Sequence, residues 1–278
     1  MLRCMKLIFK TILSLLALTI TSCSTSSIKS PSVPITQFTQ TEYRYPLNLK
    51  NLKRDSSLKK LKKILKKALP KATIESKAHS QREEYYFYTK DNALKACGIQ
   101  IRTRRYEGKK NGKITVKFRS SQPQILKYTE EVEKHEIDRT ATSNKDTKLY
   151  STSISLKNLK TKNLKTKKIL SVIEKKDPQL HTLLSTCTDQ VLKRTKKIIV
   201  HSYPVKLKGI SKTLELETRQ ICTKKCQLLP EVLELSFKAK SNSQTDLRKH
   251  LAIKEALIDA GILANPLAES KTSYLLNL

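Results

Sequence analysis

The chain has 278 residues, of which 56 are Lys or Arg and 24 are Asp or Glu, so its formal net charge at pH 7 is +32. It contains five Gly and neither G-x-G-x-x-G nor G-x-x-x-x-G-K-[ST], which excludes the common dinucleotide-binding and P-loop sites. An apolar fraction of 38% with long alternating runs argues against a disordered chain.

The N-terminal 22 residues are predicted to be an export signal. A short cationic stretch, MLRCMKLIFK, precedes the apolar run TILSLLALTI, which is too short for a membrane-spanning helix. The run ends in Ile-Thr-Ser before Cys23, and this resembles a bacterial lipobox, in which the Cys is acylated and becomes the new N-terminus. The alternative is an ordinary secretory signal with an incidental Cys. Residues 23–37 are rich in Ser, Thr and Pro, as expected of a tether, and 38–278 form the predicted domain.

The signal predicts a cell-envelope protein that is anchored to a membrane through the lipid on Cys23. The Ser after that Cys is compatible with the outer membrane of a double-membrane bacterium, on its periplasmic side. Because export implies an oxidising compartment, disulfides are expected. Cys222 and Cys226 are close enough to close a small hairpin loop as a disulfide, with a C-x3-C zinc half-site as the alternative. Cys97 and Cys187 either pair or are buried thiols.

The domain is predicted to mix strands with amphipathic helices. Strict alternation of charged and apolar residues indicates strands, and Asn111-Gly112 between two of them indicates a hairpin. Leu and Ile recur at helical spacing elsewhere, with a break at Asp177-Pro178 and with Gly261 as an expected C-cap. In chain order we expect a lysine-rich helix (57–69), four strands (82–89, 99–106, 113–119 and 130–136), a helical stretch (164–186), three strands (191–203, 213–219 and 231–238) and a helix (245–261).

Each predicted strand has a charged face and an apolar face. In the strand 99–106, Arg102 and Arg104 share one face, and Ile99 and Ile101 share the other. In an ordinary sheet the apolar face packs inward and the charged face meets water. Alternatively, the helices cover the apolar face from outside, and the charged face curls into a closed barrel of about eight strands. Like charges inside a barrel need a counter-ligand: a polyanion for Arg and Lys, and a divalent metal for neighbouring Glu.

A series of motifs along residues 38–278 resembles the CYTH-like, or triphosphate tunnel, superfamily. QTEYRY lies where that family has E-x-E-x-K, YYFYT resembles its Y-F-D-T strand, and ALKACGIQIRTR resembles its aliphatic-Gly-aliphatic-x-Arg-x-Arg stretch. ESKTSYLL resembles its C-terminal Ser-Lys strand. Each motif alone is weak, but their order along the chain is specific. The resemblance implies an α+β fold, in which a closed antiparallel β-barrel forms a tunnel and amphipathic helices pack outside it.

The resemblance also implies which residues line the tunnel. Phosphate binding falls to the basic residues Arg44, Arg102, Arg104, Lys117, Arg119, Arg194, Lys238 and Lys271. A divalent metal, Mg2+ or Mn2+, would be held by acidic residues from Glu42, Glu131, Glu133, Glu215, Glu217 and Glu234.

The chain departs from the family pattern chiefly on the metal side. Gln40 replaces the first Glu of E-x-E-x-K, Arg44 replaces its Lys, and Tyr88 replaces the Asp of Y-F-D-T. Glu234 is followed by Ser236 where a second Glu is expected. The phosphate side is thus better kept than the metal side.

Three functions are compatible with these features. One is a metal-dependent phosphohydrolase that acts on inorganic triphosphate or a nucleoside triphosphate. The second is a lipid-anchored, non-catalytic receptor for polyphosphate or another polyanion. The third is a structural envelope lipoprotein whose metal site is degenerate. Nucleic acid is not an expected partner, because export argues against it and no recognition motif accompanies the charge.

Overall fold

The computed structural model describes residues 38–278 apart from 50–51, 124–131, 162–163, 242, 266–270 and 277–278. The predicted signal and tether, with Cys23, lie outside the described residues, as does Glu131. Among the described residues, no helix is both long enough and apolar enough to cross a membrane.

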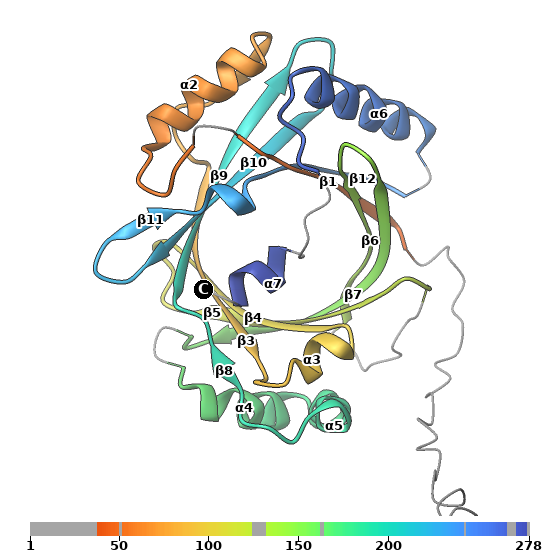
Figure 1. Cartoon of the computed structure of the whole chain (residues 1–278). Helices are drawn as coiled ribbons and strands as arrows, with labels where there is room; N and C mark the ends of the chain where they lie inside the picture. Colours follow the sequence, from red (N-terminus) through yellow and green to blue (C-terminus); the bar gives the residue numbers. More distant parts are fainter. Residues whose placement is uncertain are drawn as a thin grey trace, which may run out of the picture. The chain divides into compact units, whose positions relative to one another are not determined.

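Nine strands pair edge to edge and close into a ring (Figure 1). They are β1 (Gln40–Pro46), β3 (Ser80–Tyr88), β4 (Ile99–Tyr106), β5 (Gly112–Ser120), β6 (Val132–Ala141), β7 (Asp146–Leu159), β9 (Lys197–Leu207), β10 (Thr213–Cys222) and β12 (Glu234–Lys240). The order around the ring is β10, β12, β1, β6, β7, β5, β4, β3 and β9, and the pairing of β9 with β10 closes it. Three short strands, β2 (Ala72–Ile74), β8 (Lys193–Arg194) and β11 (Cys226–Leu228), extend the sheet beside β9, β3 and β10. The predicted α+β barrel is therefore confirmed.

The pairing differs from the prediction in one detail. β1 and β6 run parallel, with Glu42 opposite Asp138, whereas the other eight neighbouring pairs are antiparallel. The tunnel is thus a mixed barrel of nine strands, not an antiparallel barrel of about eight. The parallel pair matters for the site because it brings two acid-bearing strands side by side.

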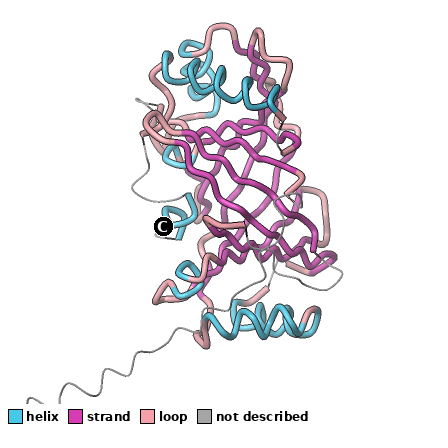
Figure 2. The backbone as a smooth tube through the Cα atoms, turned by 90° about the vertical axis from the view of Figure 1, so that its right-hand side faces the viewer, coloured by secondary structure: helices cyan, strands magenta, loops and turns pink. Residues whose placement is uncertain are grey.

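Alternation along the strands sends charged side chains into the ring and apolar side chains out of it. On β1, Glu42 and Arg44 face the interior, whereas Tyr43 and Tyr45 are buried in the core outside the ring. On β5, Lys117 faces inward, and the neighbouring Val116 is buried outside. Figure 2 shows the strands wrapped around the interior, with helices above and below them. Of the two arrangements open to the sequence, the structure therefore adopts the one with its charged face inside.

Two helices cover one side of the barrel, α2 (Leu58–Ala68) and α6 (Gln244–Asp259) (Figure 1). Leu61 and Leu65 of α2 and Ile253 and Leu257 of α6 are buried in one cluster with outward side chains of the strands. The Ser57 hydroxyl caps α2 by accepting from the backbone N–H of Lys60 at 3.2 Å. The lysines of α2 are left on the outer side of the helix, which is the amphipathic arrangement that the spacing predicts.

The opposite side of the barrel is covered by α3 (Ala93–Ala96), α4 (Ile169–Lys176) and α5 (Pro178–Cys187). The break predicted at Asp177-Pro178 separates α4 from α5. Asp177 caps α5 by accepting from the backbone N–H of Leu180 at 2.8 Å, and Pro178 is the first helical residue. Two 3-10 turns, η2 (Thr166–Lys168) and η3 (Pro230–Val232), precede α4 and β12.

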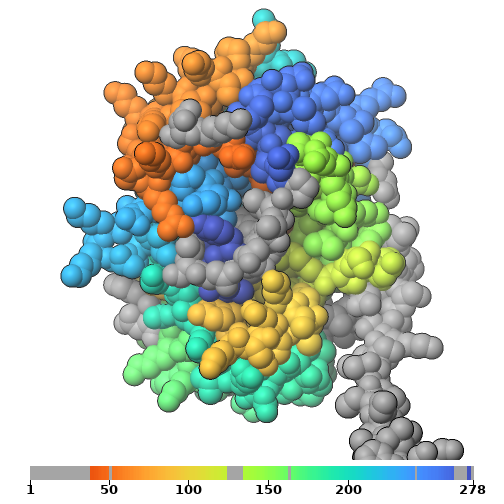
Figure 3. Space-filling model, viewed as in Figure 1, coloured from red at the N-terminus to blue at the C-terminus, as the bar shows by residue number. Residues whose placement is uncertain are grey.

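A short C-terminal helix, α7 (Lys271–Leu276), lies within the ring near one mouth of the barrel (Figures 1 and 2). Its Leu275 is fully buried in an apolar cluster with the inward-facing Tyr86, Ile198 and Val200. The space-filling view of Figure 3 shows this helix in the middle of the mouth, next to α3. The predicted C-terminal Ser-Lys strand is therefore wrong, because this segment is a helix packed on the inner wall. The side chain of Lys271 lies outside the described residues.

The described cysteines form two disulfides. Cys222 and Cys226 close the turn between β10 and β11. Cys97 and Cys187, which are 90 residues apart in the sequence, join the ends of α3 and α5. The Cys222–Cys226 bond leaves no thiolate for the alternative zinc half-site.

Candidate functional site

Charged side chains from seven of the nine strands of the ring line the tunnel. The inward-facing cations are Arg44, Arg82, Arg102, Arg104, Lys117, Arg119, Lys134, Arg219 and Lys238. The inward-facing carboxylates are Glu42, Glu84, Glu136, Asp138, Glu217 and Glu234. Among the described residues, cations in this lining therefore outnumber carboxylates by nine to six. The ion pairs between them form two groups, each centred on a buried carboxylate.

The first group, the Glu84 cluster, consists of Arg82, Glu84, Arg104, Glu217 and Arg219. The Glu84 carboxylate is fully buried and accepts from Arg82 Nε at 2.8 Å, Arg104 Nε at 2.7 Å and the Tyr86 hydroxyl at 2.8 Å. Glu217 accepts from both Arg82 and Arg219. Burial alone would raise the pKa of Glu84, but Arg104 and Arg82 outweigh burial and hold that pKa well below its usual range. The cluster is an ion-paired network of three guanidinium groups and two carboxylates.

The second group, the Asp138 cluster, consists of Glu42, Arg44, Lys117, Arg119, Lys134, Glu136, Asp138 and Lys238. Three cations contact Asp138: Arg44 Nη2 at 3.1 Å, Lys117 Nζ at 2.9 Å and Arg119 Nε at 3.2 Å. Arg44 also pairs with Glu42, its neighbour on the same face of β1. Three lysines surround Glu136: Lys134 at 2.6 Å, Lys238 at 3.5 Å and Lys117 at 3.8 Å.

The electrostatic balance of the Asp138 cluster is uneven. Burial would raise the pKa of Glu42, but Arg44, Lys238 and Lys117 outweigh it and lower the pKa to about 2. The same kind of competition holds the pKa of Asp138 far below its usual range. For Lys117 burial prevails: together with Arg119 and Arg44 it outweighs the attraction of Asp138 and lowers the pKa of the ammonium to about 7. Glu42 and Asp138 are therefore ionised at neutral pH, while Lys117 is only partly protonated.

Three carboxylates of this cluster are suitably placed for a divalent ion. Glu42, Glu136 and Asp138 each offer one oxygen, and these oxygens lie within 4.8 Å of one another. The parallel pairing of β1 with β6 brings Glu42 opposite Asp138. Mg2+ and Mn2+ prefer such hard oxygen ligands and complete their shells with water or phosphate oxygens. The three carboxylates fit a divalent metal. To bind it, they would exchange their ion pairs with the surrounding Lys and Arg side chains for metal contacts, and those cations would pair with another anion.

Arg102 differs from the other inward-facing arginines because it forms no ion pair with a carboxylate of the described residues. Its Nε is buried and has no hydrogen-bond partner among those residues, a feature that it shares with the Nε of Arg219. Burial, reinforced by the neighbouring Arg104, lowers the pKa of Arg102, whereas the pKa of Arg82 and of Arg219 is raised by their carboxylate partners. A buried donor without a partner is costly, so an anion that accepts from Arg102 would relieve that cost.

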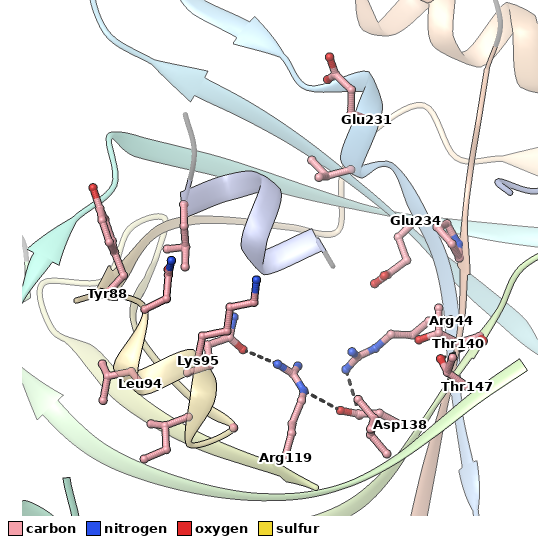
Figure 4. Close-up of a pocket in the computed structure, with 18 of the residues that line it drawn as sticks. Arg44, Tyr88, Leu94, Lys95, Arg119, Asp138, Thr140, Thr147, Glu231 and Glu234 are labelled. Atoms are coloured by element: carbon pink, nitrogen blue, oxygen red, sulfur yellow. Dashed lines mark hydrogen bonds and ion pairs between the residues drawn. The ribbon is translucent and has the colours of Figure 1, made fainter. Parts of the chain in front are cut away.

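A cavity of about 480 Å3 opens at the mouth where α7 lies. Arg44, Arg119 and Asp138 line its inner end, and Figure 4 shows both guanidinium groups directed at the Asp138 carboxylate. Arg119 also donates to Gln100 Oε1 at 3.0 Å. Leu94 of α3 and Leu276 of α7 line the outer part. The Asp138 cluster is thus accessible from the cavity.

The structure brings six of the predicted phosphate-binding residues into the tunnel: Arg44, Arg102, Arg104, Lys117, Arg119 and Lys238. Arg194 lies elsewhere, on β8. It is exposed, its guanidinium stacks over Tyr85 at 4.7 Å, and it donates to the Leu164 carbonyl at 3.2 Å. This places Arg194 outside the ring. The prediction for Lys271 concerns a side chain outside the described residues.

The predicted metal ligands are dispersed. Glu42 belongs to the carboxylate group described above, Glu217 is held in the Glu84 cluster, and Glu234 is buried in the lining. Glu215 is 38% exposed, and its nearest ionic contact is His79 at 3.9 Å. Glu131 and the side chain of Glu133 lie outside the described residues.

Sequence reasoning missed several lining residues, above all Glu136 and Asp138. Neither shares the face that the alternation of Glu131 and Glu133 predicts, because the register of β6 shifts between Val132 and Lys134. Arg82 and Glu84 lie within the predicted strand 82–89, and their alternation could have found them.

No known family model matches the chain, and no curated protein does. Among solved structures, it is similar to a putative adenylate cyclase from Bacillus halodurans, with 14% identity over 85% of this chain and 97% of the other, at a TM-score of 0.42. It is also similar to the putative adenylyl cyclase HpAC1 from Hippeastrum, described as having a dominant triphosphatase activity, with 11% identity over 86% and 96% of the two chains, at a TM-score of 0.48.

Proposed function

We propose that the barrel interior binds a triphosphate-type or polyphosphate-type anion. The observation that carries this proposal is the excess of inward-facing cations, and in particular Arg102, which is partly buried and forms no ion pair with a carboxylate of the described residues. Extended polyphosphates offer many acceptor oxygens, and arginine forks bind such oxygens in pairs. An anion lying along the tunnel would accept from Arg102 at one part and from Arg44 and Arg119 at another.

Hydrolysis of the bound anion is the more specific form of the proposal. A divalent ion held by Glu42, Glu136 and Asp138 would supply charge neutralisation at the phosphate oxygens and an activated water. The protein's own residues would position the phosphates and exchange a proton. The arginines hold the phosphates in line, and the depressed pKa of Lys117 suits it to exchange a proton near pH 7.

Binding without hydrolysis is the alternative, and the structure contains observations that favour it. The metal-side positions Gln40 and Ser236 offer no carboxylate. Each of the three candidate ligands, moreover, is already ion-paired with Lys or Arg. A tunnel of this kind would serve as a receptor for an anion, or as a structural element of the envelope.

We further propose that the protein acts in the cell envelope, held to a membrane by a lipid on Cys23. The sequence motif supports this anchor, and the two disulfides are in keeping with an oxidising compartment. The test is incorporation of radiolabelled palmitate in cells, which we expect for the wild-type chain and not for Cys23→Ala. Equal labelling of the two would refute the anchor.

Calorimetric titration with tripolyphosphate, paired with an assay of released phosphate in the presence of Mn2+, tests the proposed function. We expect saturable binding that orthophosphate does not reproduce at matched ionic strength. Phosphate release that Asp138→Asn abolishes without abolishing binding would identify a hydrolase. Binding without release would identify a receptor. Absence of saturable binding would overturn the proposal in both forms.

A further inference from the structure

The outward side of α2 and the edge strand next to it carry a concentrated group of lysines. Leu61 and Leu65 direct the apolar side of α2 into the core, so the lysines of this helix lie on its opposite side. β2 follows α2 and pairs with β9, and the backbone N–H of Lys208 donates to the Lys71 carbonyl at 3.2 Å. The exposed lysines of this surface, here called the α2 basic face, are Lys59, Lys60, Lys63, Lys66, Lys67, Lys71, Lys206 and Lys208.

The described residues do not neutralise the charge of α2. The chain has no acidic residue between Asp55 and Glu75, and no lysine of α2 forms an ion pair with a described carboxylate. Lys62 is only partly exposed and donates to two backbone carbonyls at 2.8 and 2.7 Å, so it is not counted in the face. Lysines four positions apart, such as Lys59 and Lys63, repel one another along the helix. An anionic surface laid against α2 would relieve that repulsion.

The chemistry of the α2 basic face favours a lipid surface over a polymer. The face contains neither arginine, whose planar fork selects particular anions, nor an aromatic ring on which a nucleic-acid base could stack. Its flexible ammonium groups are spread over a helix and a strand edge, which suits the mobile head groups of an anionic bilayer. Because Leu61 and Leu65 are fully buried, α2 has no apolar side left to insert into a bilayer. Contact with lipid is therefore electrostatic, and salt weakens it strongly.

We propose that the α2 basic face docks the protein on a membrane surface that contains anionic phospholipid. The inference goes beyond anion binding in the tunnel, because α2 lies outside the ring (Figure 1). α2 is at the top of that view and does not cover the mouth where α7 lies, so docking on this side leaves that mouth open. The proposed lipid on Cys23 would hold the protein near a bilayer, where a modest attraction is enough to orient it.

The experiment measures binding of the protein to sedimented vesicles of phosphatidylcholine, with and without phosphatidylglycerol. A chain that begins at Ser24 cannot carry the lipid and keeps every described element, because all of them lie within residues 38–278. Only the protein surface can then hold it on the vesicles. We expect binding to the vesicles that contain phosphatidylglycerol, no binding to phosphatidylcholine alone, and loss of the binding at high salt.

Two triple variants of equal charge localise the binding. The first removes three exposed lysines of the α2 basic face, Lys60→Gln, Lys63→Gln and Lys67→Gln. The matched control removes three exposed lysines that precede α4 on the opposite side of the barrel, Lys165→Gln, Lys167→Gln and Lys168→Gln. At about 1 kcal/mol for each lysine near an anionic surface, the first variant should bind the vesicles about a hundredfold more weakly than the wild type. The control should bind about as tightly as the wild type.

Equal weakening in the two variants would assign the binding to net charge and overturn this inference, as would binding that phosphatidylglycerol does not increase. Heparin, a soluble anionic polymer, is titrated alongside. If the first variant lost affinity for heparin while no form of the protein bound vesicles, the face would belong to a polymer and the inference would be wrong. Binding of tripolyphosphate should be unchanged in both variants, so that its failure would concern the proposed function alone.

Discussion

The two charged clusters inside the barrel are built from similar residues but differ in what they are free to do. In the Glu84 cluster every cation is an arginine, and Glu84 and Arg219 are almost completely buried. In the Asp138 cluster three cations are lysines, one of which, Lys238, is 46% exposed, and the cluster borders the cavity. The first cluster joins strands of the barrel, whereas the second can exchange its internal partners for a ligand.

The difference shows that a charged barrel interior is not by itself a binding site. Where arginines and carboxylates form ion pairs in a closed space beside apolar side chains, the network has a structural role. In the Asp138 cluster, lysines and a group of carboxylates lie beside a cavity. The charges of this cluster can therefore respond to a metal ion, to an anion and to a change of pH.

The largest expected effect comes from Glu84→Gln in the structural cluster. Removing this charge leaves Arg82 and Arg104 buried without their main partner, and we expect a loss of about 3–5 kcal/mol in the free energy of unfolding, measured in urea. The matched control is Glu83→Gln, whose partner Arg105 is partly exposed, with an expected loss below about 1 kcal/mol. Equal losses would contradict the structural role of the Glu84 cluster.

Asp138→Asn should behave differently from Glu84→Gln when an anion is added. The substitution leaves Arg44, Lys117 and Arg119 with one negative charge fewer, for which we expect a loss of about 2–3 kcal/mol in the absence of ligand. Tripolyphosphate can replace the missing charge in this accessible cluster, so it should restore the stability of Asp138→Asn but not that of Glu84→Gln. Urea unfolding with and without the anion measures both, and rescue of both variants would break the distinction.

Arg102→Gln tests the inward-facing arginine that forms no ion pair with a carboxylate of the described residues. Because its Nε makes no hydrogen bond within the described residues, we expect no loss of stability, and about a tenfold loss of affinity for tripolyphosphate. Arg105→Gln, on the outer face of the same strand, should leave that affinity unchanged. A destabilised Arg102→Gln with full affinity would show that Arg102 has a structural part instead.

The smallest effect concerns pH and Lys117. Its pKa is depressed from 10.5 to about 7 in the folded protein, so between pH 7 and 10.5 the unfolded chain holds more protons at this site. The contribution of Lys117 to stability therefore rises with pH through that window, and the penalty for its burial is fully present below pH 7. Anion affinity should fall several-fold as pH rises from 6 to 8, because Lys117 loses its charge.

The variant Lys117→Arg isolates this titration, because arginine remains charged at every pH used. The titration of the anion itself affects both proteins equally and cancels in the comparison. We expect calorimetric affinities at pH 6 and pH 8 to differ less in the variant than in the wild type. The same dependence in both would assign it to the anion or to another group.

Much of the fold follows from local sequence patterns. The alternation in segments such as 99–106 and 113–119 placed Arg102, Arg104 and Lys117 on one face, and the lysine-rich spacing of 57–69 predicted α2. β7 escaped prediction because its inward positions carry small serines in place of charges. The parallel pairing of β1 with β6 also escaped, because it joins segments about a hundred residues apart, and no local pattern encodes it.

The site was harder to predict than the fold. The sequence motifs placed Arg44 and Arg119 correctly in the lining, since basic residues in alternation must share a face. Which carboxylates meet depends on strand order and register, so Glu42 could be named from its motif, but its neighbours Glu136 and Asp138 could not be told from Glu215 and Glu217. Which carboxylate an arginine pairs with also depends on the tertiary structure, so the sequence does not distinguish the ion pairing of Arg102 from that of Arg82.

Thermal unfolding of the purified protein with tripolyphosphate, against orthophosphate at matched ionic strength, tests most directly the claim that the tunnel binds a polyanion. A ligand that binds only the folded state stabilises it by about 2.7 kcal/mol at a hundredfold excess over its Kd. The account predicts a clear rise in Tm with tripolyphosphate that Arg102→Gln diminishes. An identical Tm in the two anions would contradict it and would leave the charged lining as a purely structural network.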